Sequence, residues 1–95
     1  MSRVLISPAA LRDLEAIWEY IAEDNTRQAS NYVRRINDVF SQLADNPRCG
    51  RLRNELRQNL RSFPVGQHLI FYTVVGDVAE VVRILHSARD LSEQF

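Results

Sequence analysis

Lysine is absent from this sequence, and cysteine and glycine are scarce. All 12 basic residues are arginine. The one cysteine, Cys49, cannot form a disulfide within the chain, which argues against a disulfide-stapled secreted scaffold and favours a reducing compartment. The three glycines are too far apart for a glycine-rich phosphate-binding loop. One cysteine and two histidines do not make a metal-ligand cluster, so we expect neither a metal nor a cofactor.

Long apolar runs are missing as well. No stretch approaches the roughly 18 apolar residues that a membrane span requires, and the first residues lack the apolar segment of a signal peptide. What remains is ordinary globular composition, with 45% hydrophobic and 25% charged residues and a net charge of +0 over 95 residues. We therefore predict a single cytoplasmic domain over residues 1–95 that contacts no membrane and is not a bulk nucleic-acid binder.

Two helices are predicted from apolar residues that recur at spacings of three and four. Ser7 and Pro8 supply an N-cap and a first helical residue for a helix that runs to about Glu23. Residues 24–26 interrupt the pattern and cap a second helix, which ends near Ala44. Because the joint is short, the two helices are expected to form an antiparallel hairpin.

The β-branched and aromatic segments predict strands. These strands cover residues 3–7, Leu60–Phe63, His68–Val75 and Val78–His86. Residues 64–67 and the Gly76-Asp77 pair form the turns between the last three strands, and residues 88–95 form a polar tail. The order β-α-α-β-β-β predicts an α+β domain in which a helical hairpin packs on one face of an antiparallel sheet.

The turns also predict which residues oppose one another in the sheet. The expected pairs are Val75 with Val78, Ile70 with Arg83, Phe63 with His68, and Arg61 with Ile70. With this register Arg61, Ile70 and Arg83 would form one row across three strands on the same face.

The face that carries this row is predicted to stay free of helices. Its other members are Phe63, His68, Tyr72, Val81 and Leu85. The opposite face is predicted to pack against the helical hairpin through Leu60, Leu69, Phe71, Val82 and Ile84. An uncovered face that mixes apolar side chains with arginine predicts a binding surface.

Certain stretches of the chain are distinctive when they are taken together. They are Ala10–Ile21 (ALRDLEAIWEYI), Leu43–Gly50 (LADNPRCG), Leu60–Gly66 (LRSFPVG), Ile70–Tyr72 (IFY) and Val82–Asp90 (VRILHSARD). In this order and over nearly the whole chain, they resemble the ParE-type toxins of bacterial toxin–antitoxin modules. The resemblance implies the ParE/RelE toxin fold, in which a helical hairpin packs on an antiparallel sheet.

The resemblance also implies a function and partners. A toxin of this type poisons DNA gyrase and blocks replication, and a ParD-like antitoxin binds the toxin and neutralises it. Contact with DNA would then be indirect, through the antitoxin. We accordingly expect a non-enzymatic protein whose antitoxin pairs its carboxylates with arginines of the binding face. The predicted partner-binding residues are Arg61, Ile70, Tyr72, Arg83, Leu85 and Arg89.

Two other functions remain open at this point. The same superfamily contains ribosome-dependent mRNA endonucleases of the RelE type, and Arg61 and Arg83 match the strand arginines that such enzymes use on phosphate. The match is incomplete, because this chain has arginines where RelE-type sites carry lysines and lacks their C-terminal tyrosine. Guanidinium is also a poor proton carrier at neutral pH. The third candidate is a non-toxic relative that only binds an antitoxin.

Five further side chains are candidates for chemistry or contact. His68 is the better general base of the two histidines, whereas His86 is predicted to be a hydrogen-bonded residue at the end of a strand. Glu55 is predicted to form a salt bridge within the arginine-rich loop. Trp18 lies on the apolar stripe of the first helix and is predicted to be core, whereas Tyr20 lies off the stripe, where it can contact a partner.

Overall fold

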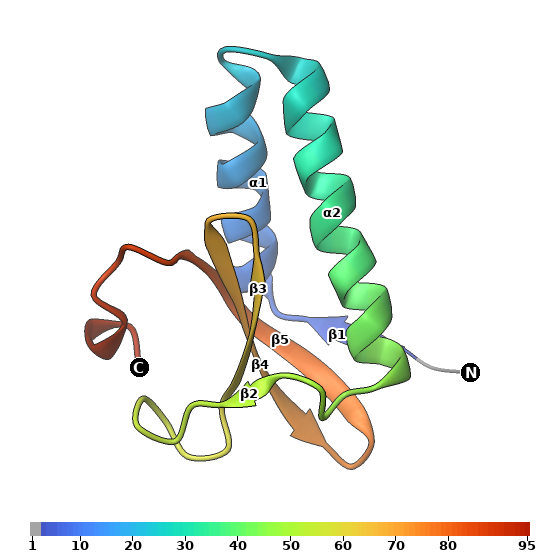
Figure 1. Cartoon of the computed structure of the whole chain (residues 1–95), viewed down its shortest axis with the longest axis vertical. Coiled ribbons are helices and arrows are strands. Elements are labelled where there is room, and N and C mark those ends of the chain that lie inside the picture. The colour runs from blue at the N-terminus through green and yellow to red at the C-terminus, as the bar shows by residue number, and fades with distance from the viewer. Residues whose placement is uncertain (1–2) are drawn as a thin grey trace.

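The structure, a computed structural model, describes residues 3–95 (Figure 1). Its helices are α1 (Pro8–Ala22), α2 (Thr26–Asp45) and the short 3-10 helix η1 (Leu91–Glu93). Its strands are β1 (Val4–Ile6), β2 (Arg51–Leu52), β3 (Arg61–Val65), β4 (His68–Val75) and β5 (Val78–His86). No helix in this range is long and apolar enough to cross a membrane. The predicted elements are all present, and β2 is an additional short strand.

All the strands form one sheet in the order β1-β5-β4-β3-β2. The predicted α+β class, with a helical hairpin packed on a sheet, is confirmed. The sheet is mixed rather than purely antiparallel, because β1 runs parallel to β5. The other neighbours are antiparallel, as expected from the hairpin turns that join β3, β4 and β5.

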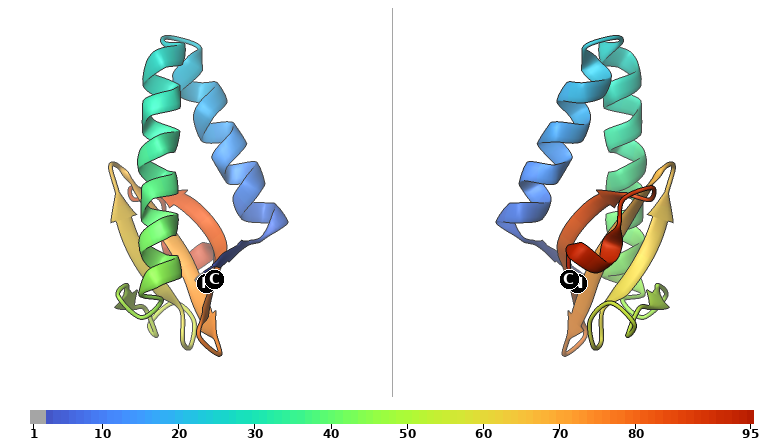
Figure 2. Two further views of the ribbon diagram at one scale, coloured as in Figure 1. Left: turned by 90° about the vertical axis from the view of Figure 1, so that its right-hand side faces the viewer. Right: turned by 90° about the vertical axis from the view of Figure 1, so that its left-hand side faces the viewer.

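The helical hairpin begins and turns at side-chain caps. The Ser7 hydroxyl accepts a hydrogen bond from the Ala10 N–H at 3.0 Å and donates to the Val82 carbonyl at 2.9 Å, so it caps α1 and ties it to β5. Asn25 caps α2 by accepting from the Gln28 N–H at 3.0 Å. The two helices then run side by side, and the end where they join extends well beyond the sheet (Figures 1 and 2).

The main core lies between the helices and one face of the sheet, and this face is the one that the sequence analysis left uncovered. Ile36 and Leu43 of α2 are fully buried in this core, together with Ile70, Tyr72 and Val81 of the sheet. The predicted choice of face is therefore wrong, except that Ile84, which was predicted to pack against the helices, does belong to this core. Each face carries a comparable set of apolar residues, so strand alternation alone does not decide which one meets the helices.

A second, smaller core covers the other face of the sheet. It contains Leu60, Phe71 and Leu85, and the C-terminal segment packs on it through Leu91 and Phe95. The rings of Phe71 and Phe95 lie 4.9 Å apart between centroids. Figure 2 shows this segment crossing the sheet on the side away from the helices. The predicted polar tail is thus a cover for this face.

Only the first of the predicted cross-strand pairings, Val75 with Val78, is confirmed. The β3–β4 turn contains two residues, whereas the sequence analysis predicts four. Gly66 adopts a positive φ of +54°, which a two-residue turn of this kind requires, and Val65 therefore faces His68. β3 continues through Pro64. β2 does not pair with this part of β3, so the sheet does not need the backbone N–H that proline lacks.

The predicted row of Arg61, Ile70 and Arg83 is wrong for two reasons. The shorter β3–β4 turn places Arg61 opposite Tyr72. A β-bulge at Phe71/Tyr72 then shifts β5 by one residue, so that Arg83 pairs with Phe71 and Ile70 with Ile84. The two arginines therefore occupy different rows of the sheet.

Candidate functional site

Arg61 holds the loop that precedes β2. Its guanidinium donates hydrogen bonds to the carbonyl oxygens of Arg48 at 3.1 Å and Gly50 at 2.8 Å. These bonds satisfy two backbone carbonyl groups of the loop, so the side chain has a structural role.

Arg83 is bound by α1. Its guanidinium forms two hydrogen bonds with the carboxylate of Asp13, at 2.7 and 3.0 Å, and the same carboxylate accepts from the Ile84 N–H at 2.9 Å. The Asp13 hydrogen bond raises the pKa of Arg83 further. This bidentate ion pair links α1 to β5, at a part of β5 that lies beyond the residues paired with β1.

Three of the predicted partner-binding residues lie inside the protein. Ile70 and Tyr72 have an exposed fraction of 0%, and Leu85 has 2%. Ile70 and Tyr72 belong to the core under the helices, and Leu85 belongs to the core under the C-terminal segment. With almost no exposed surface, these side chains support the fold.

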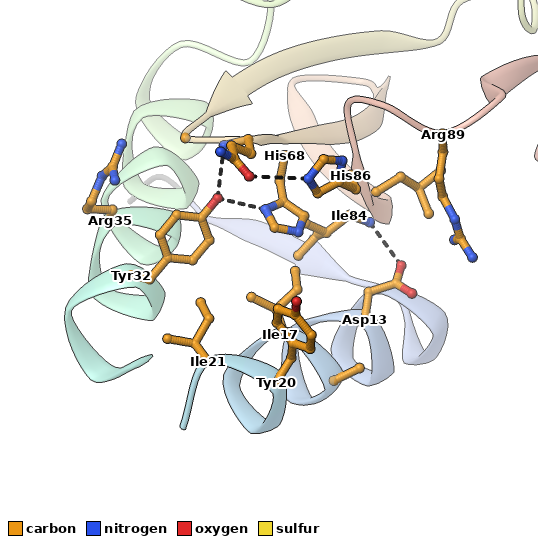
Figure 3. Close-up of a pocket in the computed structure, with 14 residues that line it drawn as sticks. Asp13, Ile17, Tyr20, Ile21, Tyr32, Arg35, His68, Ile84, His86 and Arg89 are labelled. Carbon is orange, nitrogen blue, oxygen red and sulfur yellow. Dashed lines mark hydrogen bonds between the residues drawn. The ribbon is translucent and has the colours of Figure 1, made fainter. Parts of the chain in front are cut away.

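Arg89, the remaining predicted contact, lies at the mouth of a cavity of about 780 Å³. The cavity opens between the helical hairpin and the end of the sheet where the β3–β4 turn meets the end of β5 (Figure 3). Its apolar wall comes from Ile17 and Ile21 of α1 and Ile84 of β5. Cavities of this size are typical of small-ligand sites.

A network of hydrogen bonds forms the polar wall of this cavity. The Tyr32 hydroxyl lies 2.6 Å from Nδ1 of His68, 3.1 Å from the Val65 carbonyl oxygen and 3.2 Å from the Gln67 N–H nitrogen. The Gln67 side chain in turn accepts from Nε2 of His86 at 3.3 Å. One tyrosine of α2 therefore orients the whole β3–β4 turn.

The two histidines differ in what they can offer a ligand. Nδ1 of His86 accepts from the Ala88 N–H at 3.1 Å, which places its proton on Nε2, so both ring nitrogens are occupied. The prediction of a hydrogen-bonded strand-end residue is confirmed. Among residues 3–95, the His68 ring forms a hydrogen bond through Nδ1 only, and its other ring nitrogen faces the cavity (Figure 3). Burial, and secondarily the neighbouring His86, lowers the pKa of His68, which favours the neutral imidazole.

Positively charged side chains outnumber negatively charged ones at the cavity. Arg35 and Arg89 lie at opposite ends of the opening (Figure 3), and neither forms an ion pair within residues 3–95. Asp13 is the cavity's carboxylate, and it is already neutralised by Arg83. The Arg35 guanidinium lies over the Tyr32 ring at 5.4 Å from its centroid.

Outside the cavity, the arginine-rich loop is partly neutralised. Glu55 pairs with Arg53 at 2.8 Å, as predicted, and this hydrogen bond lowers the pKa of Glu55. Arg48 pairs with Asp77 at 3.3 Å. In the described part of the chain, no group of histidine, cysteine, aspartate and glutamate side chains is suited to hold a metal ion.

On α1, the prediction that Trp18 is part of the core is wrong. It is 38% exposed, whereas its neighbour Ile17 is 9% exposed and packs in the main core. Tyr20 is 78% exposed, in agreement with its place off the apolar stripe. Sequence reasoning missed Tyr32, although it lies one helical turn before the buried Ile36 and continues that stripe.

Comparison with known proteins identifies the family. Residues 4–91 match the family model described as the ParE toxin of the type II toxin–antitoxin system parDE. The chain belongs to the ParE toxin family. It is 39% identical to Toxin ParE1 of Mycobacterium tuberculosis over 92 residues, which is 95% of this chain and 94% of the relative.

A second relative and a solved structure agree with this ParE-family membership. The chain is 34% identical to Toxin ParE3 of Caulobacter vibrioides over 99% of this chain and 95% of that protein. Its fold is similar to that of a chain from the chromosomal ParDE system of P. aeruginosa, with a TM-score of 0.76, 20% identity, and coverage of 90% and 96%. The ParE/RelE toxin fold is therefore confirmed.

Proposed function

We propose that this ParE-family chain inhibits DNA gyrase and so blocks replication, and that a ParD-like antitoxin binds and neutralises it. The observation that carries the proposal is the 39% identity to a toxin named ParE1 over 95% of the chain. The solved ParDE system with the same fold supports an antitoxin partner.

We further propose that the toxin acts by binding rather than by catalysis. Both strand arginines that an RNA-cleaving site would use are engaged inside the protein, Arg61 with loop carbonyl groups and Arg83 with Asp13. Phosphate binding by either one would have to break these bonds. Arg89 is exposed, and its side chain makes no ion pair within residues 3–95, so it remains the predicted contact for an antitoxin carboxylate.

Pulse labelling after brief induction in a bacterial host that lacks the antitoxin tests the mode of action. DNA and protein synthesis are followed in parallel over the first minutes. An early loss of DNA synthesis with translation spared is expected, followed by loss of supercoiling activity when the protein is added to purified gyrase. Early loss of translation with cleaved transcripts would instead favour an mRNA endonuclease, and no growth arrest would favour a non-toxic relative.

The antitoxin contact is tested with two exposed arginines. Arg89→Ala is expected to weaken antitoxin binding by about tenfold, because one charge-assisted hydrogen bond is worth roughly 1.5–3 kcal/mol. Arg27→Ala, at the start of α2 and away from the cavity, is the matched control. Equal affinities of the two variants would remove Arg89 from the interface.

A further inference from the structure

The arginine-rich loop, which runs from Arg48 to Arg61 and includes β2, lies apart from the antitoxin contact proposed at Arg89. β2 pairs with the first two residues of β3, whereas the cavity that Arg89 lines lies beside the β3–β4 turn, at the other end of that strand. Figure 1 shows the loop at the lower end of the molecule and the joint of the two helices at the upper end. The loop is therefore a separate surface.

The loop carries positive charge that the fold does not neutralise. It contains five arginines and one glutamate, a formal excess of four positive charges. Three of the arginines already have partners, two in ion pairs and one on backbone carbonyl groups. The other two, Arg51 and Arg57, are exposed, and neither forms an ion pair within residues 3–95. These two guanidinium groups are available to a partner.

The loop is fixed to the sheet by backbone and side-chain contacts. The Arg53 N–H donates to the Leu60 carbonyl at 2.7 Å, and the Leu60 N–H donates to the Arg57 carbonyl at 3.1 Å. Leu56 packs against the smaller core. The Arg57 guanidinium lies over the Phe95 ring, 5.5 Å from its centroid. A cation that is already stacked on a ring loses less conformational freedom when it binds a partner.

The composition of this surface favours a protein partner over a nucleic acid. Leu52 follows Arg51 in β2, which is an edge strand of the sheet, and it is 46% exposed. An apolar side chain among arginines is typical of protein interfaces, in which the centre is apolar and arginine is enriched. A phosphate backbone does not bury a leucine, and tight binding to it requires many cations rather than two.

The charge distribution of the whole chain favours an acidic partner at the loop. Residues 1–47 contain five arginines and seven acidic residues, whereas residues 48–95 contain seven arginines and five acidic residues. Glu15, Glu19 and Glu23 are exposed on the helical hairpin. An acidic surface is repelled by these carboxylates and attracted by the loop, so the field of the protein orients its approach.

We propose that Arg51, Leu52 and Arg57 form the surface through which this toxin contacts an acidic patch on gyrase. The identity of the partner rests on the proposed function, whereas its acidic chemistry rests on the loop. The two guanidinium groups pair with carboxylates of the partner, and Leu52 supplies the apolar part of the contact.

The test measures binding of the whole chain to purified gyrase without DNA, together with inhibition of supercoiling. The double variant Arg51→Glu, Arg57→Glu should weaken both by about a hundredfold, since each charge-assisted contact is worth about tenfold. The matched control, Arg27→Glu with Arg34→Glu, changes the net charge equally at exposed positions of α2. It should weaken binding by less than about threefold, because charges outside the contact act only through screened attraction.

Leu52→Ser keeps the charge of the loop and tests its apolar part. This variant should weaken gyrase binding by about tenfold, with the dependence on salt concentration unchanged, whereas the double arginine variant should lose most of that dependence. All variants should unfold at the urea concentration of the wild type within experimental error, because the substituted side chains are exposed.

Three results would overturn the inference, and they are distinguishable. Inhibition by the double arginine variant that equals inhibition by the wild type would remove the loop from the contact and leave the proposed function standing. A wild type that neither binds nor inhibits gyrase would overturn the proposed function and this inference with it. Binding to duplex DNA that the double variant loses, with no binding to gyrase in the absence of DNA, would show that the loop contacts nucleic acid instead.

Discussion

The phenolic oxygen of Tyr72 accepts a hydrogen bond from the backbone N–H of Gly50 at 2.7 Å. Tyr72 is fully buried in the middle of β4, and Gly50 ends the loop that follows α2, so this bond joins the helical hairpin to the centre of the sheet. A Cβ atom at position 50 would lie 2.4 Å from the same oxygen, which explains why the close approach needs glycine. Burial raises the pKa of Tyr72, so the hydroxyl stays protonated.

Removal of this oxygen should destabilise the protein. In Tyr72→Phe the ring still fills the core, but the buried Gly50 N–H loses its partner. We expect the free energy of unfolding to fall by about 1–3 kcal/mol, measured by urea denaturation. Tyr20→Phe, at a largely exposed site, is the control and should change stability by less than about 0.5 kcal/mol. If both variants unfold at the same urea concentration, the hydrogen bond between Tyr72 and Gly50 contributes no net stability.

Substitutions of Asp13 and of Arg83 should lower the free energy of unfolding by different amounts. Asp13→Ala leaves both the Arg83 guanidinium and the Ile84 N–H without a partner, so it should cost about 2–3 kcal/mol. Arg83→Ala should cost less, roughly 1 kcal/mol, because Asp13 still accepts from Ile84 and the arginine is partly exposed. Asp38→Ala, exposed on α2, is the control. The reverse order in denaturation experiments would contradict this assignment.

Local sequence signals predict the elements of this fold well, and long-range pairing poorly. Ser7, Pro8 and Asn25 determine helix starts through contacts within one turn, and Gly76-Asp77 closes a two-residue hairpin. The bulge at Phe71/Tyr72 depends on how β5 meets the ends of β1 and α1, so no short segment encodes it. This shift and the shorter β3–β4 turn each move one of the two arginines, Arg83 and Arg61, away from the predicted row.

The candidate site was less accessible to prediction than the fold. The sequence predicts His68 as the better general base of the two histidines, but not its partner Tyr32, which is 36 residues away, nor its surroundings, which depend on the two-residue β3–β4 turn. Choosing the wrong face for the helices placed most of the predicted binding surface on the side that the helical hairpin covers. Arg89 was the one predicted contact whose position did not depend on the register.

The two turn glycines offer a matched pair that isolates the Tyr32 contact. Gly66 and Gly76 both have positive φ, +54° and +61°. A Cβ atom at Gly66 would lie 2.5 Å from the Tyr32 hydroxyl, whereas at Gly76 nothing lies within 4 Å. Gly76→Ala should therefore cost about 1 kcal/mol from backbone strain alone, and Gly66→Ala should cost clearly more. Equal losses on urea denaturation would mean that the Tyr32 network adds nothing to the stability of this turn.

The His68 network makes stability depend on pH near neutrality. Because burial lowers the pKa of His68 in the folded state, the unfolded chain takes up a proton near pH 6.5 while the folded protein does not yet do so. The stabilisation is complete above the unfolded pKa and is lost as pH falls below it, by at most about 1.4 kcal/mol per pH unit for one proton. Urea denaturation of the wild type and of His68→Gln at pH 7.5, 6.5 and 5.5 measures this difference, since the carboxylates titrate alike in both. Identical slopes would show that the His68 imidazole titrates in the folded protein as it does in the unfolded chain.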